Sequence, residues 1–325
     1  MLSAGDKVIF WLFTGFLGIF TIFFNMYLML VNQKSYRKNH KLNPADFIIT
    51  VFAVASITQQ ISSYLWQTMD KIDPECKFNI LATVLLVITF SLKLIVIWTM
   101  AFLTFYYSTK LVVQPVHCYT RIQEAIVKHV HIVSAVIVVS GFANCVPLLT
   151  VMTYYNGTTD EISDCGSLMP TDHSGLVYIF YYVVISDIVP GIVMVKCCIS
   201  ILYHLAKHLQ HMKASTNGSH GPKLGTQLRV IKMTITLEAM FLCFLAVDLF
   251  TQFTVVLKRQ NTVTLTILFS SIYTTVTAFV LIYGKKSCWK ELIASYNLFL
   301  DEYPVLSGMK VTEVKTEPHE NSHGH

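Results

Sequence analysis

The segment Trp98-Thr-Met-Ala-Phe-Leu-Thr-Phe-Tyr-Tyr-Ser-Thr-Lys110 ends a long apolar stretch that starts at Cys76. Residues 78–109 contain a single charged side chain, that of Lys93, and about 20 apolar residues are enough to cross the hydrocarbon core of a membrane. The stretch therefore predicts a membrane-spanning helix that is tilted and protrudes. Because a charge in lipid is costly, Lys93 is predicted to face a bundle interior, a partner charge or a ligand.

The rest of the chain has the same apolar character. Of its residues, 54% are hydrophobic and 13% are charged, which indicates a polytopic membrane protein. The short alternating segments of a β-barrel are not found, so the predicted fold is an all-α membrane protein with a seven-transmembrane-helix domain over residues 1–286. The seven predicted helices cover residues 8–31, 47–66, 78–109, 132–155, 176–202, 233–257 and 262–284.

Lysine and arginine are unevenly divided between the loops at the two ends of these helices. Fifteen lie at one end and five at the other. Because cytoplasmic loops are enriched in these residues, we expect a multi-pass plasma-membrane protein with its amino terminus outside and its carboxyl terminus in the cytoplasm. The outer side then contains a glycosylation acceptor, Asn156, and two cysteines, Cys76 and Cys165. In an oxidising compartment these cysteines predict a disulfide, with two free thiols as the alternative.

The chain after the seventh helix divides into two parts. Residues 287–300 mix apolar and charged side chains and predict a short amphipathic helix on the inner surface of the membrane lipid, where Cys288 is a candidate for palmitoylation. Residues 301–325 are polar and are predicted to form a disordered cytoplasmic tail.

Several functional classes are excluded by what the sequence lacks. It has no catalytic motif and no cofactor or metal motif, so we expect neither an enzyme nor a bound cofactor. Its net charge of +5 comes with basic residues beside apolar segments, which membrane topology explains without nucleic acid. An odd helix count and an unmatched Pro190 argue against a transporter, and a retinal protein would need a lysine in residues 262–284. A seven-helix receptor remains.

Separated motifs in the chain resemble those of the type 2 (bitter) taste receptors, a family of G-protein-coupled receptors. The matching residues, in chain order, are Asn25, Val31-Asn32, Lys41-Leu42, Asp46, Trp98, Leu103, Tyr107, Lys110, Pro190, Leu205, His208, Met212, Arg229, Lys232 and Leu281-Ile282-Tyr283-Gly284. Most other seven-helix receptors have Asp-Arg-Tyr where this chain ends its third helix with Tyr107 and Lys110.

The chain also departs from the pattern of that family. Ser56 stands where the family has an arginine, Thr277-Ala278 replaces His-Ser, and most mammalian members lack the outer cysteine pair. These differences are compatible with a divergent, non-mammalian member. They leave a type 1 vomeronasal-like olfactory receptor as an alternative. From a different class, the alternative is a seven-helix transporter.

The resemblance implies a small-molecule agonist bound in the outer half of the bundle and a heterotrimeric G protein, of an inhibitory or gustducin-like class, bound at the inner end. The residues expected to contact the G protein are Tyr107, Lys110, His208, Met212, Arg229 and Lys232. The alternative is that the basic residues among them only satisfy the topology of the inner loops.

Two interpretations of Lys93 are left open by the sequence. Asp187 and Asp248 lie at comparable estimated depth, so Lys93 forms a buried ion pair in the first interpretation. In the second, Lys93 receives the acidic group of an amphiphilic, bile-acid-like ligand. The residues expected to line the ligand site beside these three are Thr89, Phe90, Trp66, Phe180, Tyr181, Phe241 and Phe244.

Overall fold

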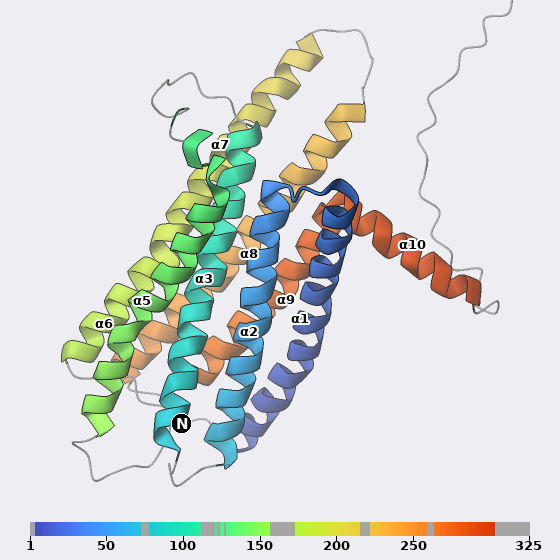
Figure 1. Cartoon of the computed structure of the whole chain (residues 1–325). Helices are drawn as coiled ribbons and strands as arrows, with labels where there is room; N and C mark the ends of the chain where they lie inside the picture. Colours follow the sequence, from blue (N-terminus) through green and yellow to red (C-terminus); the bar gives the residue numbers. More distant parts are fainter. Residues whose placement is uncertain are drawn as a thin grey trace, which may run out of the picture.

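The computed structural model describes residues 4–72, 78–111, 121, 124–126, 128–156, 173–214, 222–258 and 263–302. These residues form helices and no strand, and seven of the helices are long and apolar enough to cross a membrane. The predicted all-α, seven-helix bundle is therefore confirmed (Figure 1). The elements are α1 (Ala4–Asn39), α2 (Pro44–Ile72), α3 (Asn79–Leu111), α5 (Val130–Asn156), α6 (His173–Val183), η1 (Val184–Ile188), α7 (Val189–Ala214), α8 (Pro222–Lys258), α9 (Val263–Gly284) and α10 (Lys286–Glu302).

The helices run past the apolar segments that predict them. The sixth apolar segment covers residues 233–257, whereas α8 begins at Pro222. An apolar run records only the part of a helix that crosses hydrocarbon, and the helix continues into the headgroup region and water. The tail predicted to be disordered starts at residue 301, but α10 continues to Glu302. Residues 303–325, the disulfide expected between Cys76 and Cys165, and the side chain of Asn156 fall outside the described residues.

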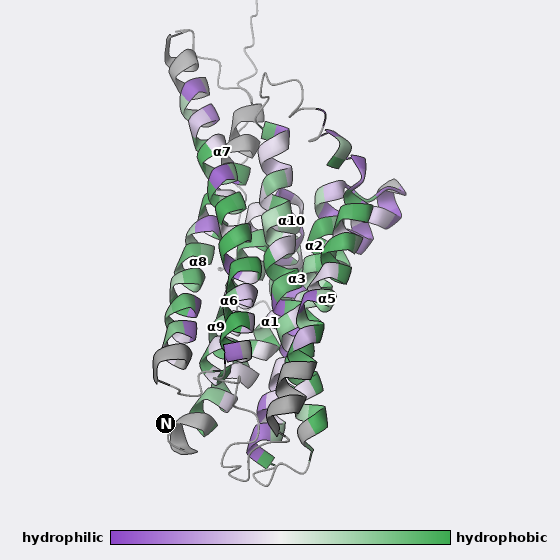
Figure 2. Ribbon diagram, turned by 90° about the vertical axis from the view of Figure 1, so that its left-hand side faces the viewer, coloured by the Kyte–Doolittle hydropathy of each residue, from purple (hydrophilic) through white to green (hydrophobic). Residues whose placement is uncertain are grey.

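The outer surface of the bundle is apolar and its interior holds many polar side chains. Ile19 and Phe23 of α1 and Val139 of α5 are more than half exposed, while Thr21 and Asn25 of α1 are fully buried. Figure 2 shows hydrophobic residues along the sides of the helices. This distribution fits a lipid environment, because lipid solvates apolar side chains and polar ones must find partners inside the bundle.

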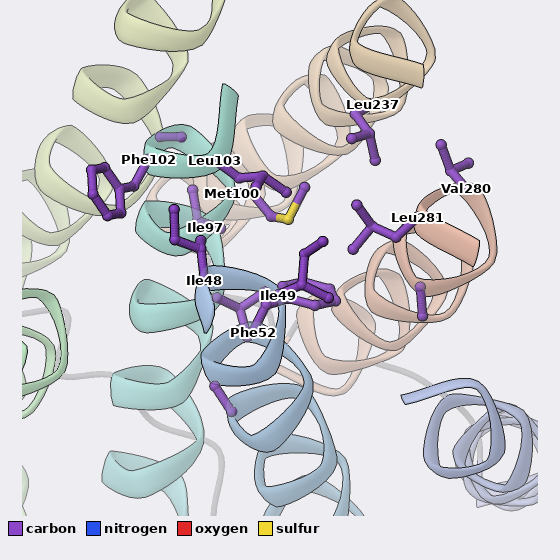
Figure 3. Packing of buried hydrophobic residues seen from close by; sticks show 14 of the residues in the cluster. Ile48, Ile49, Phe52, Ile97, Met100, Phe102, Leu103, Leu237, Val280 and Leu281 are labelled. Carbon is purple, nitrogen blue, oxygen red and sulfur yellow. The ribbon is translucent and has the colours of Figure 1, made fainter. Parts of the chain in front are cut away.

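The core lies where α2, α3, α8 and α9 meet. Ile49 and Phe52 of α2, Met100 of α3, Leu237 of α8 and Leu281 of α9 converge there, and each is at most 3% exposed (Figure 3). α3 packs against α2, α5 and α7, so most of its faces are covered by protein. This central position explains why α3 is apolar around its whole circumference.

α5 approaches α3 closely at a glycine. A Cβ atom added to Gly141 would lie 2.3 Å from Ile95 Cγ1 and 3.0 Å from Ile95 Cδ1. Ile95 is 1% exposed, so its side chain has little room to move. The absence of a side chain at Gly141 is therefore needed for this contact between the third and fourth membrane spans.

α10 contacts α1, and Lys285, the residue before α10, contacts α2. Tyr27 Oη donates a hydrogen bond of 2.8 Å to the carbonyl oxygen of Cys288, and Lys34 Nζ lies 2.7 Å from Glu291 Oε2. Just before α10, Lys285 Nζ lies 2.8 Å from Asp46 Oδ1. Cys288 is fully buried, and burial raises the pKa of its thiol. Both properties disfavour palmitoylation of Cys288 in this arrangement.

Candidate functional site

Lys93 lies between two carboxylates in the interior of the bundle. Its Nζ atom is 2.8 Å from Asp248 Oδ2 and 3.5 Å from Asp187 Oδ1. The three residues are 2%, 1% and 0% exposed, respectively. We call these three residues the buried charge cluster. It joins α3, η1 and α8, so the internal ion pair that the sequence leaves open is present, and with both aspartates.

A π-helical turn, η1, places Asp187 in the cluster. A π-helix has i→i+5 hydrogen bonds and occurs as single turns in α-helices, frequently at functional sites. Ser186 and Asp187 are both fully buried, and Ser186 Oγ donates a hydrogen bond to Asp187 Oδ2. Trp98 Nε1 donates a hydrogen bond of 3.0 Å to the carbonyl oxygen of Ile185. Trp98 of α3 thus holds the turn that presents Asp187.

Two aromatic rings flank the ammonium group of Lys93. Nζ lies 5.6 Å from the ring centroid of Tyr182 and 5.4 Å from that of Phe244. Tyr182 Oη donates a hydrogen bond of 3.0 Å to the carbonyl oxygen of Phe90, and the rings of Phe90 and Tyr182 meet edge to face at 5.4 Å. A cation near aromatic faces in a dry interior is stabilised by their quadrupoles.

Most of the residues predicted to line the site lie in the interior around this cluster. Trp66, Phe90 and Thr89 are buried, and Thr89 Oγ1 donates a hydrogen bond of 3.1 Å to Ser62 Oγ of α2. Phe241 is also buried, as is Phe244. The ring of Phe244 stacks on Tyr273 of α9 at 4.9 Å, and that of Phe241 meets Tyr273 at 6.2 Å.

Phe180 and Tyr181 do not face the cluster, contrary to the prediction that they line the ligand site. Phe180 is 73% exposed and Tyr181 is 42% exposed. The aromatic residues of α6 that turn inward are Tyr178 and Tyr182, which are 7% and 3% exposed. Residues three and four apart lie on the same helix face, so the inward face contains 178 and 182 together with the buried Ile179, whereas 180 and 181 lie on the outer face. That spacing was the signal for Tyr178 and Tyr182, which sequence reasoning missed.

The residues predicted to contact a G protein lie near the C-terminal ends of α3 and α7 and in the N-terminal part of α8. Lys110 and Lys232 are exposed, and Tyr107 is half-buried against the core. Arg229 donates hydrogen bonds of 3.0 and 2.8 Å from Nε and Nη2 to the carbonyl oxygen of Tyr283, which joins α8 to the end of α9. The remaining two, His208 and Met212, belong to α7, but their side chains lie outside the described part of the chain.

A family model described as taste receptor protein (TAS2R) matches residues 1–294. The chain belongs to this family. A search of curated proteins finds no match. The membership confirms the resemblance seen in the motifs and decides against the vomeronasal-like and transporter alternatives. A taste receptor is a G-protein-coupled receptor and not an enzyme, and its partners are small-molecule ligands and G proteins.

We expect Trp98→Phe to lower the free energy of unfolding of this taste receptor by about 1–3 kcal/mol, because the carbonyl oxygen of Ile185 loses the part-buried hydrogen bond from the indole. Thermal unfolding of the purified receptor in detergent measures the change. Trp289→Phe in α10 is the matched control, since Trp289 lies outside the membrane-spanning helices. Equal losses in the two variants would contradict the role of Trp98 in holding η1.

Proposed function

We propose that this taste receptor lies in the plasma membrane with its amino terminus outside, binds small bitter-type agonists in the outer half of its bundle, and activates a heterotrimeric G protein of an inhibitory or gustducin-like class at its inner end. The family match over residues 1–294 carries the proposal. Its support in the molecule is the continuity of α3, which contains Lys93 in the interior and Tyr107 and Lys110 at the inner end.

The proposed ligand site includes Trp66, Thr89 and Phe90, on the outer side of the buried charge cluster. Of the ligand classes, the acidic, bile-acid-like amphiphile has the weaker support. Lys93 already has two carboxylate partners, and an acidic ligand group would be a third carboxylate near one ammonium group. Bringing like charges together in a dry interior costs several kcal/mol. Neutral agonists avoid this cost.

Agonist binding is proposed to shift the population toward a bundle whose inner end is open to the G protein. The contact that must change is the pair of hydrogen bonds from Arg229 to the carbonyl oxygen of Tyr283, since it fastens α8 to α9. Tyr107 packs against the core cluster that includes Leu281 and Ile282, and it lies at the end of the helix that contains Lys93. It is therefore placed to transmit a shift of α3 to the inner end.

We expect Tyr107→Ala to abolish agonist-driven signalling while surface expression stays intact. The receptor is expressed in cells with a promiscuous G protein and screened with a panel of bitter compounds by calcium imaging, and the active compounds are then tested on the variant. Tyr203→Ala is the matched control, because Tyr203 is 72% exposed on α7. An unchanged response of Tyr107→Ala would contradict its coupling role, and uptake of the compounds without any G-protein response would contradict the receptor function.

A further inference from the structure

The buried charge cluster contains more negative than positive charge. It holds one ammonium group, that of Lys93, and two carboxylates, those of Asp187 and Asp248. All three side chains are at least 97% buried. Unpaired charge in a dry interior costs several kcal/mol even after relaxation. One ammonium group cannot compensate two carboxylates, so the cluster needs a second positive charge.

Two oxygen atoms of the cluster are also without hydrogen-bond donors among the described residues. Asp187 Oδ1 and Asp248 Oδ1 are buried and accept no hydrogen bond. Their partner atoms are engaged, since Asp187 Oδ2 accepts from Ser186 and Asp248 Oδ2 accepts from Lys93. Asp187 Oδ1 has only the 3.5 Å ion-pair contact with Lys93 Nζ, and no ion pair joins Asp248 Oδ1 to a described residue. Buried carboxylate oxygens almost always have a hydrogen-bond donor or a cation, so these two oxygens are a separate sign of a missing partner.

Other side chains around the cluster do not supply the missing charge. The titratable neighbours that interact with it in the described structure are Cys145 of α5, Tyr182 of α6 and Tyr273 of α9. Thiol and phenol groups are neutral or negative, never positive. The rings of Tyr182 and Phe244, which flank the Lys93 ammonium group, add favourable faces for a cation but no counter-charge.

We propose that the buried charge cluster binds one small monovalent cation, with Na⁺ as the probe, on Asp187 Oδ1 and Asp248 Oδ1. Hard cations take oxygen ligands, and a bare ion needs less space than any organic ammonium compound, which suits a cluster that is almost completely buried. The two aspartates come from η1 and α8, so a cation that binds both ties the fifth and sixth spans together. This proposal depends on the geometry of the cluster and not on the proposed agonist or G protein.

The test is thermal unfolding of the purified full-length receptor in lipid nanodiscs, in sodium chloride or in N-methylglucamine chloride at equal ionic strength. We expect Na⁺ to raise the unfolding midpoint by about 3 °C and the effect to saturate. Asp187→Asn and Asp248→Asn are each expected to remove this shift. Glu238→Gln is the matched control, because Glu238 is another buried carboxylic acid of α8, and it should keep the shift.

Each outcome decides the proposal. No difference between the two salts in the wild type, or a shift that persists in either asparagine variant, overturns it. A protein that is stabilised by acid but not by Na⁺ overturns it as well, because a proton then supplies the second charge. If the variants do not fold, sodium NMR on the wild type replaces them: saturable line broadening that acid reverses supports the site, and its absence refutes it.

Discussion

Replacing Lys93 by methionine is expected to lower the free energy of unfolding by about 3–5 kcal/mol, the usual cost of removing one partner from a buried ion pair. The substitution keeps most of the apolar volume of the side chain but leaves Asp187 and Asp248 buried without their ammonium group. At roughly 2–4 °C per kcal/mol, the unfolding midpoint should fall by about 10 °C. Surface expression in cells should fall with it.

A variant without any charge in the cluster separates electrostatics from packing. Lys93→Met combined with Asp187→Asn and Asp248→Asn has no uncompensated charge, and replacing a whole buried ion pair by neutral groups is often close to neutral for stability. We therefore expect the triple variant to recover most of the midpoint lost by Lys93→Met. A triple variant as unstable as the single one would show that packing, and not charge, makes Lys93 important.

Gly141→Ala is expected to lower the free energy of unfolding by about 1–3 kcal/mol, the range for overpacking in a core. The new methyl group would overlap Ile95 Cγ1 at 2.3 Å, so α5 must move away from α3 or Ile95 must leave its position. Alanine stabilises a helix interior by roughly 1 kcal/mol relative to glycine, and the cost of overpacking should exceed this gain. Thermal unfolding in detergent measures the net loss.

The double variant with Ile95→Ala tests the cause of that loss. Ile95→Ala alone should cost about 2–5 kcal/mol through the cavity it leaves. It also removes Cγ1 and Cδ1, the atoms of Ile95 that approach the added Cβ most closely. The two substitutions are therefore expected to cost clearly less together than the sum of their separate costs. Strict additivity would contradict a direct contact between Gly141 and Ile95.

The sequence predicted the spans and the depth of Lys93 well, for a simple reason. A charge in the middle of an apolar span has few solutions, and two acidic residues at matching depth restrict them further. The family could also be predicted, because its motifs occur in order along the chain, and the match to residues 1–294 confirms it. Whether Lys93 pairs with one aspartate or with both could not be predicted from the sequence, because the position of Asp187 depends on the π-helical turn η1.

Inward and outward faces were harder to predict in the fifth span. Phe180 and Tyr181 have the same aromatic character as Tyr178 and Tyr182, and composition does not say which pair turns inward. Arg229 agrees with the predicted membrane topology whatever it contacts, so its hydrogen bonds to the carbonyl oxygen of Tyr283 could not be predicted from the sequence. Partners that are backbone atoms have no residue type by which a sequence could reveal them.

The π-helical turn between α6 and α7 has a consequence for the orientation of everything that follows it. An α-helix advances about 100° per residue, and a π-turn accommodates one residue more than an α-turn. If Val184–Ile188 were regular α-helix, the face of α7 that now contains the buried Met194 and Cys198 would be rotated by about 100° about the helix axis. The turn therefore acts as a fixed angular offset, which lets one continuous span point Tyr182 and Met194 into the same bundle.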